Sequence, residues 1–250
     1  MVGLVANMLY LYLIYLTVMT ELRQAVLSLF KTYKTRHLFL AFILFWTPVI
    51  IFAKLAGEIV EKEPIGWDVS VLHWIHGFST PLLDSIFFFF TTIGGIQVIL
   101  PVTIATLAYL LYKKQRLNSL IILFGVGGAA VANGILKLIF HRDRPAFWHS
   151  LVTGTGYSFP SGHAMASSAL VLCLVVILWD TRWRTLTIIT GVILVFMVGL
   201  SRLYFGVHYP TDVVAGWSVS LIWIVIVASI AKGVSARRVS QEYNRHRNVI

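Results

Sequence analysis

Charged side chains are scarce in this chain of 250 residues, where Asp, Glu, Lys and Arg together make up 12%. An ordinary soluble domain carries about 25%, whereas here 58% of the residues are hydrophobic and the mean hydropathy is +0.83. The charges are clustered, which leaves uncharged runs near the length that a helix needs to cross a bilayer core, about 20 residues. Such runs are too long for barrel strands, and spanning segments must satisfy their own backbone hydrogen bonds. The composition therefore predicts an all-α, polytopic membrane helix bundle.

Acidic residues and cysteine are scarcer still, with 10 Asp and Glu against 20 Lys and Arg, and a single cysteine. The net charge of +10 does not indicate a nucleic-acid partner, because the basic residues lie in short segments between apolar runs. Membrane topology explains that placement better. Cys173 lies inside an apolar run and has no second cysteine to pair with, so we expect it to be a packing residue.

Six spans are predicted, at residues 38–53, 95–112, 118–136, 164–179, 185–200 and 213–231. Residues 1–20 are uncharged and barely long enough to cross, and they lack the positive region of a signal peptide. We expect a seventh, N-terminal hydrophobic helix there, either spanning or lying against the bundle. The predicted organisation is thus an N-terminal segment, 1–36, a six-span domain, 37–231, and a basic tail, 232–250.

The basic residues between the spans predict which way the bundle faces. The positive-inside rule makes cytoplasmic the side that holds most of them, namely Arg23, Lys31, Lys34, Arg36, Lys113, Lys114, Arg116, Arg182, Arg184, Lys232, Arg237, Arg238, Arg245 and Arg247. Most acidic residues of the opposite side precede the second span and offset Lys54 and Lys62: Glu58, Glu61, Glu63 and Asp68. Asp143 lies beside Arg142, and if it offsets that arginine, Lys137, Arg144 and Arg202 are left on the outer side without an acidic partner. The C-terminus is predicted to be cytoplasmic.

Between the first two spans, apolar residues recur at helical spacing over residues 71–78, and Thr80-Pro81 is typical of a helix start before the Phe-rich run 82–90. Two short helices lying in the outer membrane interface fit this pattern. The alternative is a loop followed by an early start of the second span. We assign no chemistry to His73 and His76, which are expected to be interfacial polar residues.

Three motifs fall on the outer face, and the first is Lys137-x6-Arg144-Pro145. Its seven-residue spacing is close to two helical turns, so the two cations share one side if the helix continues. Charged residues near a span end often simply extend to the interface, which is the alternative here.

The second motif, Pro160-Ser161-Gly162-His163, comes at the start of the fourth span. Ser161 is a natural N-cap, and glycine lets a ligand approach the backbone closely. A helix start with unpaired N–H groups is an anion site. The alternative is an ordinary capped helix, although His163 favours the functional interpretation.

The third motif is Ser201-Arg202-x5-His208-x3-Asp212. A histidine and an aspartate four residues apart at a helix start are able to touch. The carboxylate then accepts the proton of one ring nitrogen and leaves the other as a nucleophile. A capping aspartate beside a surface histidine is the alternative, but it does not explain Arg202.

Together these motifs resemble the three-part signature of the type-2 phosphatidic acid phosphatase superfamily, complete and in order over residues 137–212. The resemblance implies a lipid phosphatase like the bacterial members that act on phosphatidylglycerol phosphate or undecaprenyl pyrophosphate, in phospholipid metabolism or recycling of the cell-wall lipid carrier. It also implies that phosphoryl oxygens are held by Lys137, Arg144, Arg202, Ser161 and Gly162. Arginine suits bidentate contact, and cations with helix amides suit phosphoryl transfer.

For the chemistry, the resemblance implies that His208, oriented by Asp212, attacks phosphorus and forms a phosphohistidine. His163 then protonates the leaving lipid oxygen and later activates water. We expect no metal and no cofactor, because the outer face lacks a carboxylate cluster near the motifs and its histidines lack ligand spacing. Residues 141–143 are expected to shape the rim of the site.

Other functions remain open at this stage. A phosphotransferase that moves the phosphoryl group to another lipid or a sugar would use the same site. A non-enzymatic lipid-binding or transport protein would keep the cations but would not need His208 or Asp212. The vanadate-dependent haloperoxidases share this kind of site, but they are soluble. The lipid substrate and the oligomeric state are not fixed by the sequence.

Overall fold

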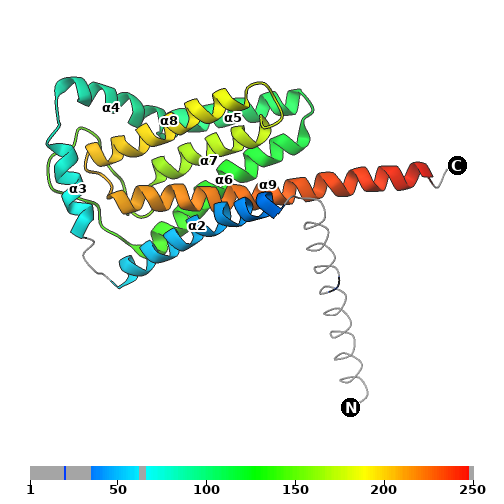
Figure 1. The fold of residues 1–250 in the computed structure, drawn as a ribbon. Helices are drawn as coiled ribbons and strands as arrows, with labels where there is room; N and C mark the ends of the chain where they lie inside the picture. Colours follow the sequence, from blue (N-terminus) through cyan, green and yellow to red (C-terminus); the bar gives the residue numbers. More distant parts are fainter. Residues whose placement is uncertain (1–19, 21–34, 62–65, 248–250) are drawn as a thin grey trace, which may run out of the picture. The chain divides into compact units, whose positions relative to one another are not determined.

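The computed structural model describes residue 20, residues 35–61 and residues 66–247. These residues form helices without any β-strand, which confirms the predicted all-α class. The helices run in the order α2 Thr35–Val60, α3 Gly66–His76, α4 Pro81–Ile93, α5 Ile96–Tyr112, α6 Arg116–Phe140, α7 Gly162–Ile177, α8 Arg184–Tyr204 and α9 Pro210–Arg247 (Figure 1). The predicted N-terminal helix at residues 1–20 lies almost wholly outside the described residues.

The chain divides into two compact units, residues 1–47 and residues 48–250, and α2 runs through the division. In the first unit, Phe42, Ile43 and Trp46 of α2 are exposed, and the rings of Phe42 and Trp46 lie 5.9 Å apart. The second unit contains the three motifs and all of α3 to α9.

Helix α7 is the centre of the second unit, and it packs against α6, α8 and α9 (Figure 1). Its side chains Met165, Ala169 and Cys173 are almost fully buried. A Cβ atom on Gly125 of α6 would lie 2.3 Å from the sulfur of Cys173, so the two helices approach closely at this glycine. The prediction that Cys173 is a packing residue is confirmed.

Among the described residues, three single helices are long and apolar enough to cross a membrane: α6, α8 and the Pro210–Ser235 part of α9. Helices α4 and α5, bent by 42° at their junction, meet the same test together and would form a fourth span. Helix α7 is a shorter apolar helix of 16 residues. The predicted spans at 95–112, 118–136, 164–179, 185–200 and 213–231 each match one helix within a few residues, α9 excepted, which continues far beyond residue 231.

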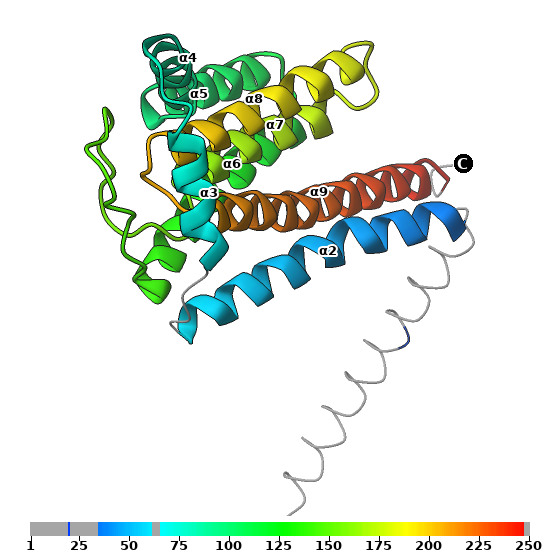
Figure 2. The same cartoon turned by 60° about the vertical axis from the view of Figure 1, so that its left-hand side comes forward.

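The two short helices predicted before the second span are present. Helix α3 crosses one end of the bundle, transverse to α6, α8 and α9 (Figures 1 and 2). Helix α4 starts as predicted, with Pro81 at its first position and Thr80 as N-cap, accepting a hydrogen bond from the backbone N–H of Leu83 at 3.3 Å. Because α4 and α5 also qualify together as one bent span, the early-start alternative stands beside the interfacial one.

The predicted basic tail, residues 232–250, begins as a continuation of the last helix. Helix α9 continues without a break to Arg247. The reason is local, because residues 232–247 contain no proline and include four Arg together with one Lys, one Ala, one Gln and one Glu, all of which favour a helix. A single glycine, Gly233, does not end it.

Candidate active site

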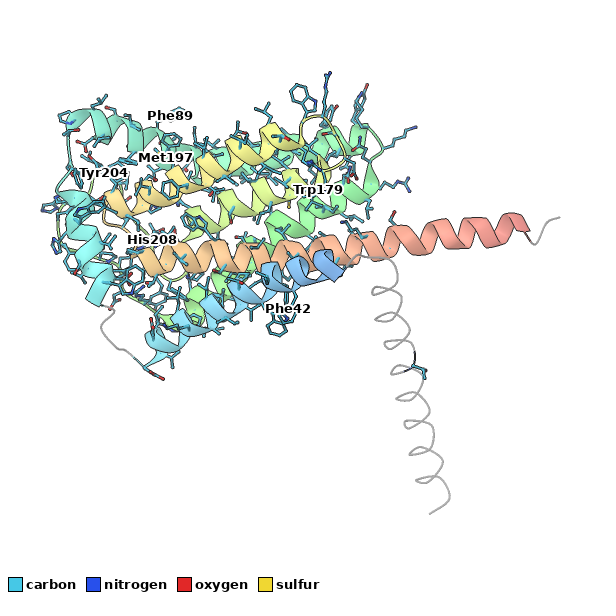
Figure 3. All side chains as sticks on the ribbon, in the orientation of Figure 1. Phe42, Phe89, Trp179, Met197, Tyr204 and His208 are labelled. Atoms are coloured by element: carbon cyan, nitrogen blue, oxygen red, sulfur yellow. The ribbon has the colours of Figure 1, made fainter. Side chains whose placement is uncertain are left out.

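The three motifs meet at the end of the bundle that α3 crosses. They lie at the last turn of α6, the start of α7, the last turn of α8 and the start of α9. Figure 3 shows His208 there, beside the first turn of α9, and Trp179 at the opposite end. The candidate site is therefore built where four helix ends converge.

His208 and Asp212 form the contact expected from their spacing. Helix α9 begins at Pro210, so Asp212 lies in its first turn, and its Oδ2 is 3.3 Å from Nδ1 of His208. The backbone N–H of Tyr209 donates to the same oxygen at 2.8 Å. Both His208 and Asp212 are buried, at 1% and 0% exposure. The carboxylate thus faces one ring nitrogen only.

The other ring nitrogen of His208, Nε2, lies 3.0 Å from Nη1 of Arg144. A guanidinium only donates hydrogen bonds, so Nε2 carries the lone pair and Nδ1 carries the proton that points to Asp212. Burial and then the charges of Arg202, Arg144 and Lys137 hold the pKa of His208 well below its ordinary value. The imidazole is neutral at pH 7, in the tautomer that leaves Nε2 nucleophilic.

Arg144 is held by backbone carbonyls and not by a helix. Helix α6 ends at Phe140, and His141 adopts a left-handed conformation with φ of 46°. The helix therefore does not continue to Arg144, and the condition for Lys137 and Arg144 to share a helix face is not met. Instead, the guanidinium donates to four carbonyl oxygens: Gly156 at 2.9 Å, Val207 at 2.7 Å, Thr155 at 2.9 Å and Tyr157 at 3.3 Å. Lys137 also donates to the Tyr157 carbonyl, at 2.5 Å. The two cations converge by this shared acceptor.

Ser161 occupies the N-cap position of α7 but does not cap the helix with its side chain. Its Oγ is buried and has no hydrogen-bond partner among the described residues. The backbone N–H of Ser161 donates to the carbonyl oxygen of Asp212 at 3.0 Å, which joins the second motif to the third. The predicted N-cap position of Ser161 is thus confirmed, while its hydroxyl is left available to a ligand.

Gly162 and His163 form the first turn of α7. A Cβ atom on Gly162 would lie 3.2 Å from Oδ1 of Asn133, whose Nδ2 donates to the carbonyl of Pro160 at 3.1 Å. The backbone therefore passes close to α6 at the first turn of α7, where the N–H groups have no carbonyl partner within the helix. His163 is partly buried and within electrostatic range of His208 and the three cations Arg202, Arg144 and Lys137.

Arg202 is buried in the last turn of α8 with 3% exposure. Its Nη1 donates to Oγ1 of Thr91 on α4, while its Nε has no hydrogen-bond partner among the described residues. A buried donor without a partner costs about 1–3 kcal/mol. With the hydroxyl of Ser161, this makes two buried polar groups in the motifs that await an acceptor or donor.

Two residues of the site were assigned wrongly from the sequence. Arg142 was expected at the rim, and Asp68 was expected to offset Lys54 and Lys62, yet Asp68 is 1% exposed and pairs with Nη2 of Arg142 at 2.8 Å. Nη1 of Arg142 reaches Oδ1 of Asp212 at 2.6 Å. A signal was present, since Asp68 shares helical spacing with Leu72 and Ile75 and all three are buried.

Within the described part of the chain, His, Cys, Asp and Glu side chains form no cluster of three suited to a metal ion. Asp68 and Asp212 are instead bridged by Arg142. Metal independence stays a prediction, which the chelator experiment below tests.

Residues 118–235 match the PAP2 superfamily. The chain is 31% identical over 153 residues to phosphatidylglycerophosphatase B of Bacillus subtilis, covering 59% of this chain and 74% of that protein. It is 30% identical over 172 residues to undecaprenyl-diphosphatase of Sulfolobus acidocaldarius, covering 67% and 78%. Its fold is similar to the crystal structure of a transmembrane PAP2 type phosphatidylglycerolphosphate phosphatase from Bacillus subtilis, with a TM-score of 0.68, 24% identity and coverage of 75% and 96%.

Proposed function

Because this chain belongs to the PAP2 superfamily, we propose that it is a lipid phosphatase with His208 as nucleophile and no metal. The substrate is a lipid phosphate or pyrophosphate, such as phosphatidylglycerol phosphate, phosphatidic acid or undecaprenyl pyrophosphate. The relatives are named for two of these lipids. The observation that carries the proposal is a neutral His208 in contact with the carboxylate of Asp212. Beside this pair, the hydroxyl of Ser161 and Nε of Arg202 are buried without a hydrogen-bond partner among the described residues.

Substrate binding uses those two groups first. The hydroxyl of Ser161 and Nε of Arg202 gain phosphoryl oxygens as partners, and the N–H groups of the first turn of α7, Gly162 and His163, add the helix-start contribution. Lys137 and Arg144 bring two further positive charges from α6 and the loop after it. Preorganised charge of this kind is the main source of catalysis in phosphoryl transfer.

Attack follows when the Arg144 guanidinium turns from Nε2 of His208 to the phosphoryl oxygens, which frees the lone pair. The negative charge of the bound phosphate favours the protonated form of His163. The Nε2–P bond forms, the bond from phosphorus to the lipid oxygen breaks, and the protonated His163 donates its proton to that oxygen. Nδ1 keeps its proton, and the carboxylate of Asp212 stabilises the positive ring. His163 next takes a proton from water, which attacks phosphorus, and His208 leaves as a neutral imidazole with inorganic phosphate as product.

We assign the site to the extracytoplasmic side of the cell membrane, with a multi-pass chain and a cytoplasmic C-terminus. The distribution of basic residues supports this. Arg182 lies in the connection between α7 and α8 that also holds Trp179, Arg184 begins α8, and Lys113 and Lys114 connect α5 to α6. Trp179 lies at the end of the bundle opposite His208 (Figure 3). A lipid then keeps its tails in the bilayer while its phosphate reaches the depth of His208.

The test is phosphate release from phosphatidylglycerol phosphate by protein purified in detergent, with excess EDTA. We expect release by the wild type to resist EDTA, and His208→Ala to abolish it. His149→Ala is the matched control, because it removes an exposed histidine of the loop between α6 and α7 and is expected to leave phosphate release unchanged. Equal release by wild type and His208→Ala would contradict the nucleophile assignment, and release lost with EDTA would contradict metal independence.

The same assay separates hydrolysis from transfer. A phosphotransferase would release little phosphate from the lipid until an acceptor alcohol is added. An acid-labile phosphoenzyme, labelled from a 32P-lipid and absent in His208→Ala, is expected in either case. Release without an acceptor supports the phosphatase.

A further inference from the structure

We propose that Asp68 of α3 is a positioning residue that acts through Arg142 to hold the carboxylate of Asp212 against His208. This assignment rests on the function proposed above. It extends the pair His208–Asp212 to a chain of four charged or titratable groups that ends on a helix outside the three motifs.

The first step is that the two carboxylate oxygens of Asp212 have different hydrogen-bond partners. Oδ2 faces His208 and accepts from the backbone N–H of Tyr209. Oδ1 accepts from Nη1 of Arg142 at 2.6 Å. Because each oxygen has its own donors, the carboxylate cannot rotate about its axis without losing a charged hydrogen bond. Arg142 thereby fixes the direction in which Oδ2 meets the imidazole.

The second step is that Asp68 fixes Arg142. Its Oδ2 accepts from Nη2 of Arg142 at 2.8 Å. Asp68 is in turn fixed by Thr211, whose backbone N–H donates to Oδ1 at 3.0 Å and whose hydroxyl donates to Oδ2 at 2.6 Å. The guanidinium lies 4.1 Å from the centre of the Tyr209 ring. The guanidinium of Arg142 is therefore held by carboxylates at both of its terminal nitrogens and by the Tyr209 ring on one face.

The third step is electrostatic. Arg142 is 15% exposed in its side chain, Asp68 1% and Asp212 0%, so the charges are only weakly screened by water. One guanidinium shared by two carboxylates leaves a net charge of about −1, which offsets the cations around His208. The pKa of Arg142 would be lowered by burial, but Asp212 and Asp68 raise it above its ordinary value. Removing either partner of Arg142 changes the field that His208 experiences.

A purely structural role, in which Asp68 only ties α3 to α9, makes a different prediction. It predicts lower stability with an unchanged titration of His208. The groups that set this titration come from every element around the ring: Lys137 of α6, Arg142 and Arg144 of the following loop, His163 of α7, Arg202 of α8, Asp212 of α9 and Asp68 of α3. With the others unchanged, Asp68→Asn removes a negative charge and Arg142→Gln removes a positive one.

The experiment measures kcat, KM and the pH dependence of kcat/KM for these two variants with phosphatidylglycerol phosphate. We expect Asp68→Asn to lower kcat about tenfold or more with little change in KM, as for other residues that orient a functional ligand. The acid limb of kcat/KM should move to lower pH in Asp68→Asn and to higher pH in Arg142→Gln, because the pKa of His208 falls and rises respectively. The double variant should return the limb to near its wild-type position.

Two further variants control for folding and for loss of any buried carboxylate. Asp68→Glu keeps the charge, so its acid limb should stay in place although the longer side chain lowers kcat. Asp84→Asn removes the carboxylate of α4 that accepts a 2.5 Å hydrogen bond from the hydroxyl of Tyr204, far in sequence from the motif histidines, and is expected to leave kcat unchanged. Thermal unfolding of each purified variant separates loss of fold from loss of positioning.

The outcomes are distinguishable. If His208→Ala is inactive, the wild type is active and neither single variant moves the acid limb, the role of Asp68 is refuted while the proposed function stands. If the wild type releases no phosphate from any lipid, the proposed function fails, and histidine NMR of the same variants still decides the positioning. Opposite shifts of the His208 titration in that measurement support the proposal, and equal or absent shifts overturn it.

Discussion

Gly154 is the most informative position for a small substitution, because it touches the catalytic apparatus only through Arg144. A Cβ atom placed there would lie 2.6 Å from Nη1 and 2.7 Å from Cζ of Arg144. Ordinary contacts begin at 3.4 Å, so Gly154→Ala must displace the guanidinium by about 0.8 Å. That displacement misaligns the guanidinium with the four carbonyl oxygens that hold it beside the phosphate-binding groups. A misplacement of about 1 Å near the reacting groups costs about 100-fold in rate.

The assay compares kcat/KM and the unfolding temperature of Gly154→Ala with those of Gly134→Ala. The control adds the same methyl group on α6, where nothing lies within 4 Å. We expect a loss of about 100-fold in kcat/KM for Gly154→Ala, a small change in its unfolding temperature, and near wild-type behaviour for the control. Activity of Gly154→Ala within twofold of the wild type would refute the view that Arg144 must be held at its observed position.

Three other predictions concern separate parts of the site. His163→Ala should damage cleavage of a lipid monophosphate more than cleavage of a lipid pyrophosphate, because phosphate leaves more easily and needs a proton less; equal damage to both would count against the general acid. His208 is neutral in the folded state with its pKa held low, so the unfolded chain takes up a proton first as the pH falls below about 6.5. Folding stability contributed by this group is complete above that pH and falls by up to about 1.4 kcal/mol per pH unit below it, so the unfolding temperature of His208→Asn should decline less between pH 7 and pH 5 than that of the wild type. Thr91→Val removes the hydroxyl that Arg202 binds, which should weaken binding of inorganic phosphate in a competition assay and lower the stability by about 1–3 kcal/mol; unchanged phosphate affinity would show that Arg202 does not depend on α4.

The sequence predicted those parts of the molecule whose rules are local. Helix positions follow from apolar runs between charged segments, and the start of α4 follows from Thr80-Pro81. The contact between His208 and Asp212 follows from four-residue spacing at a helix start. Each of these features depends on residues within one or two turns of one another.

The errors concern contacts between distant segments or with the backbone. Arg144 binds carbonyl oxygens, which every residue carries, so no side-chain pattern reveals its partners. The end of α6 is a left-handed His141, a position for which the sequence has neither Gly nor Pro as a signal. Asp68 and Arg142 are 74 residues apart, and only the docking of α3 brings them together. Arg142 therefore pairs with two carboxylates that are distant in the sequence, Asp68 and Asp212, although Asp143 is its neighbour in the chain.

The hydrogen bond from the backbone of Ser161 to the carbonyl of Asp212 has a practical consequence. Both partners are main-chain atoms, so the joint between the start of α7 and the start of α9 does not depend on which side chain occupies position 161, 208 or 212, proline at 161 excepted. We therefore expect a His208→Asn protein to keep its phosphate-binding groups in place while turnover stops. Such an inactive protein should retain its lipid substrate when it is isolated from its native membrane. Mass spectrometry of the retained lipid would then identify the substrate.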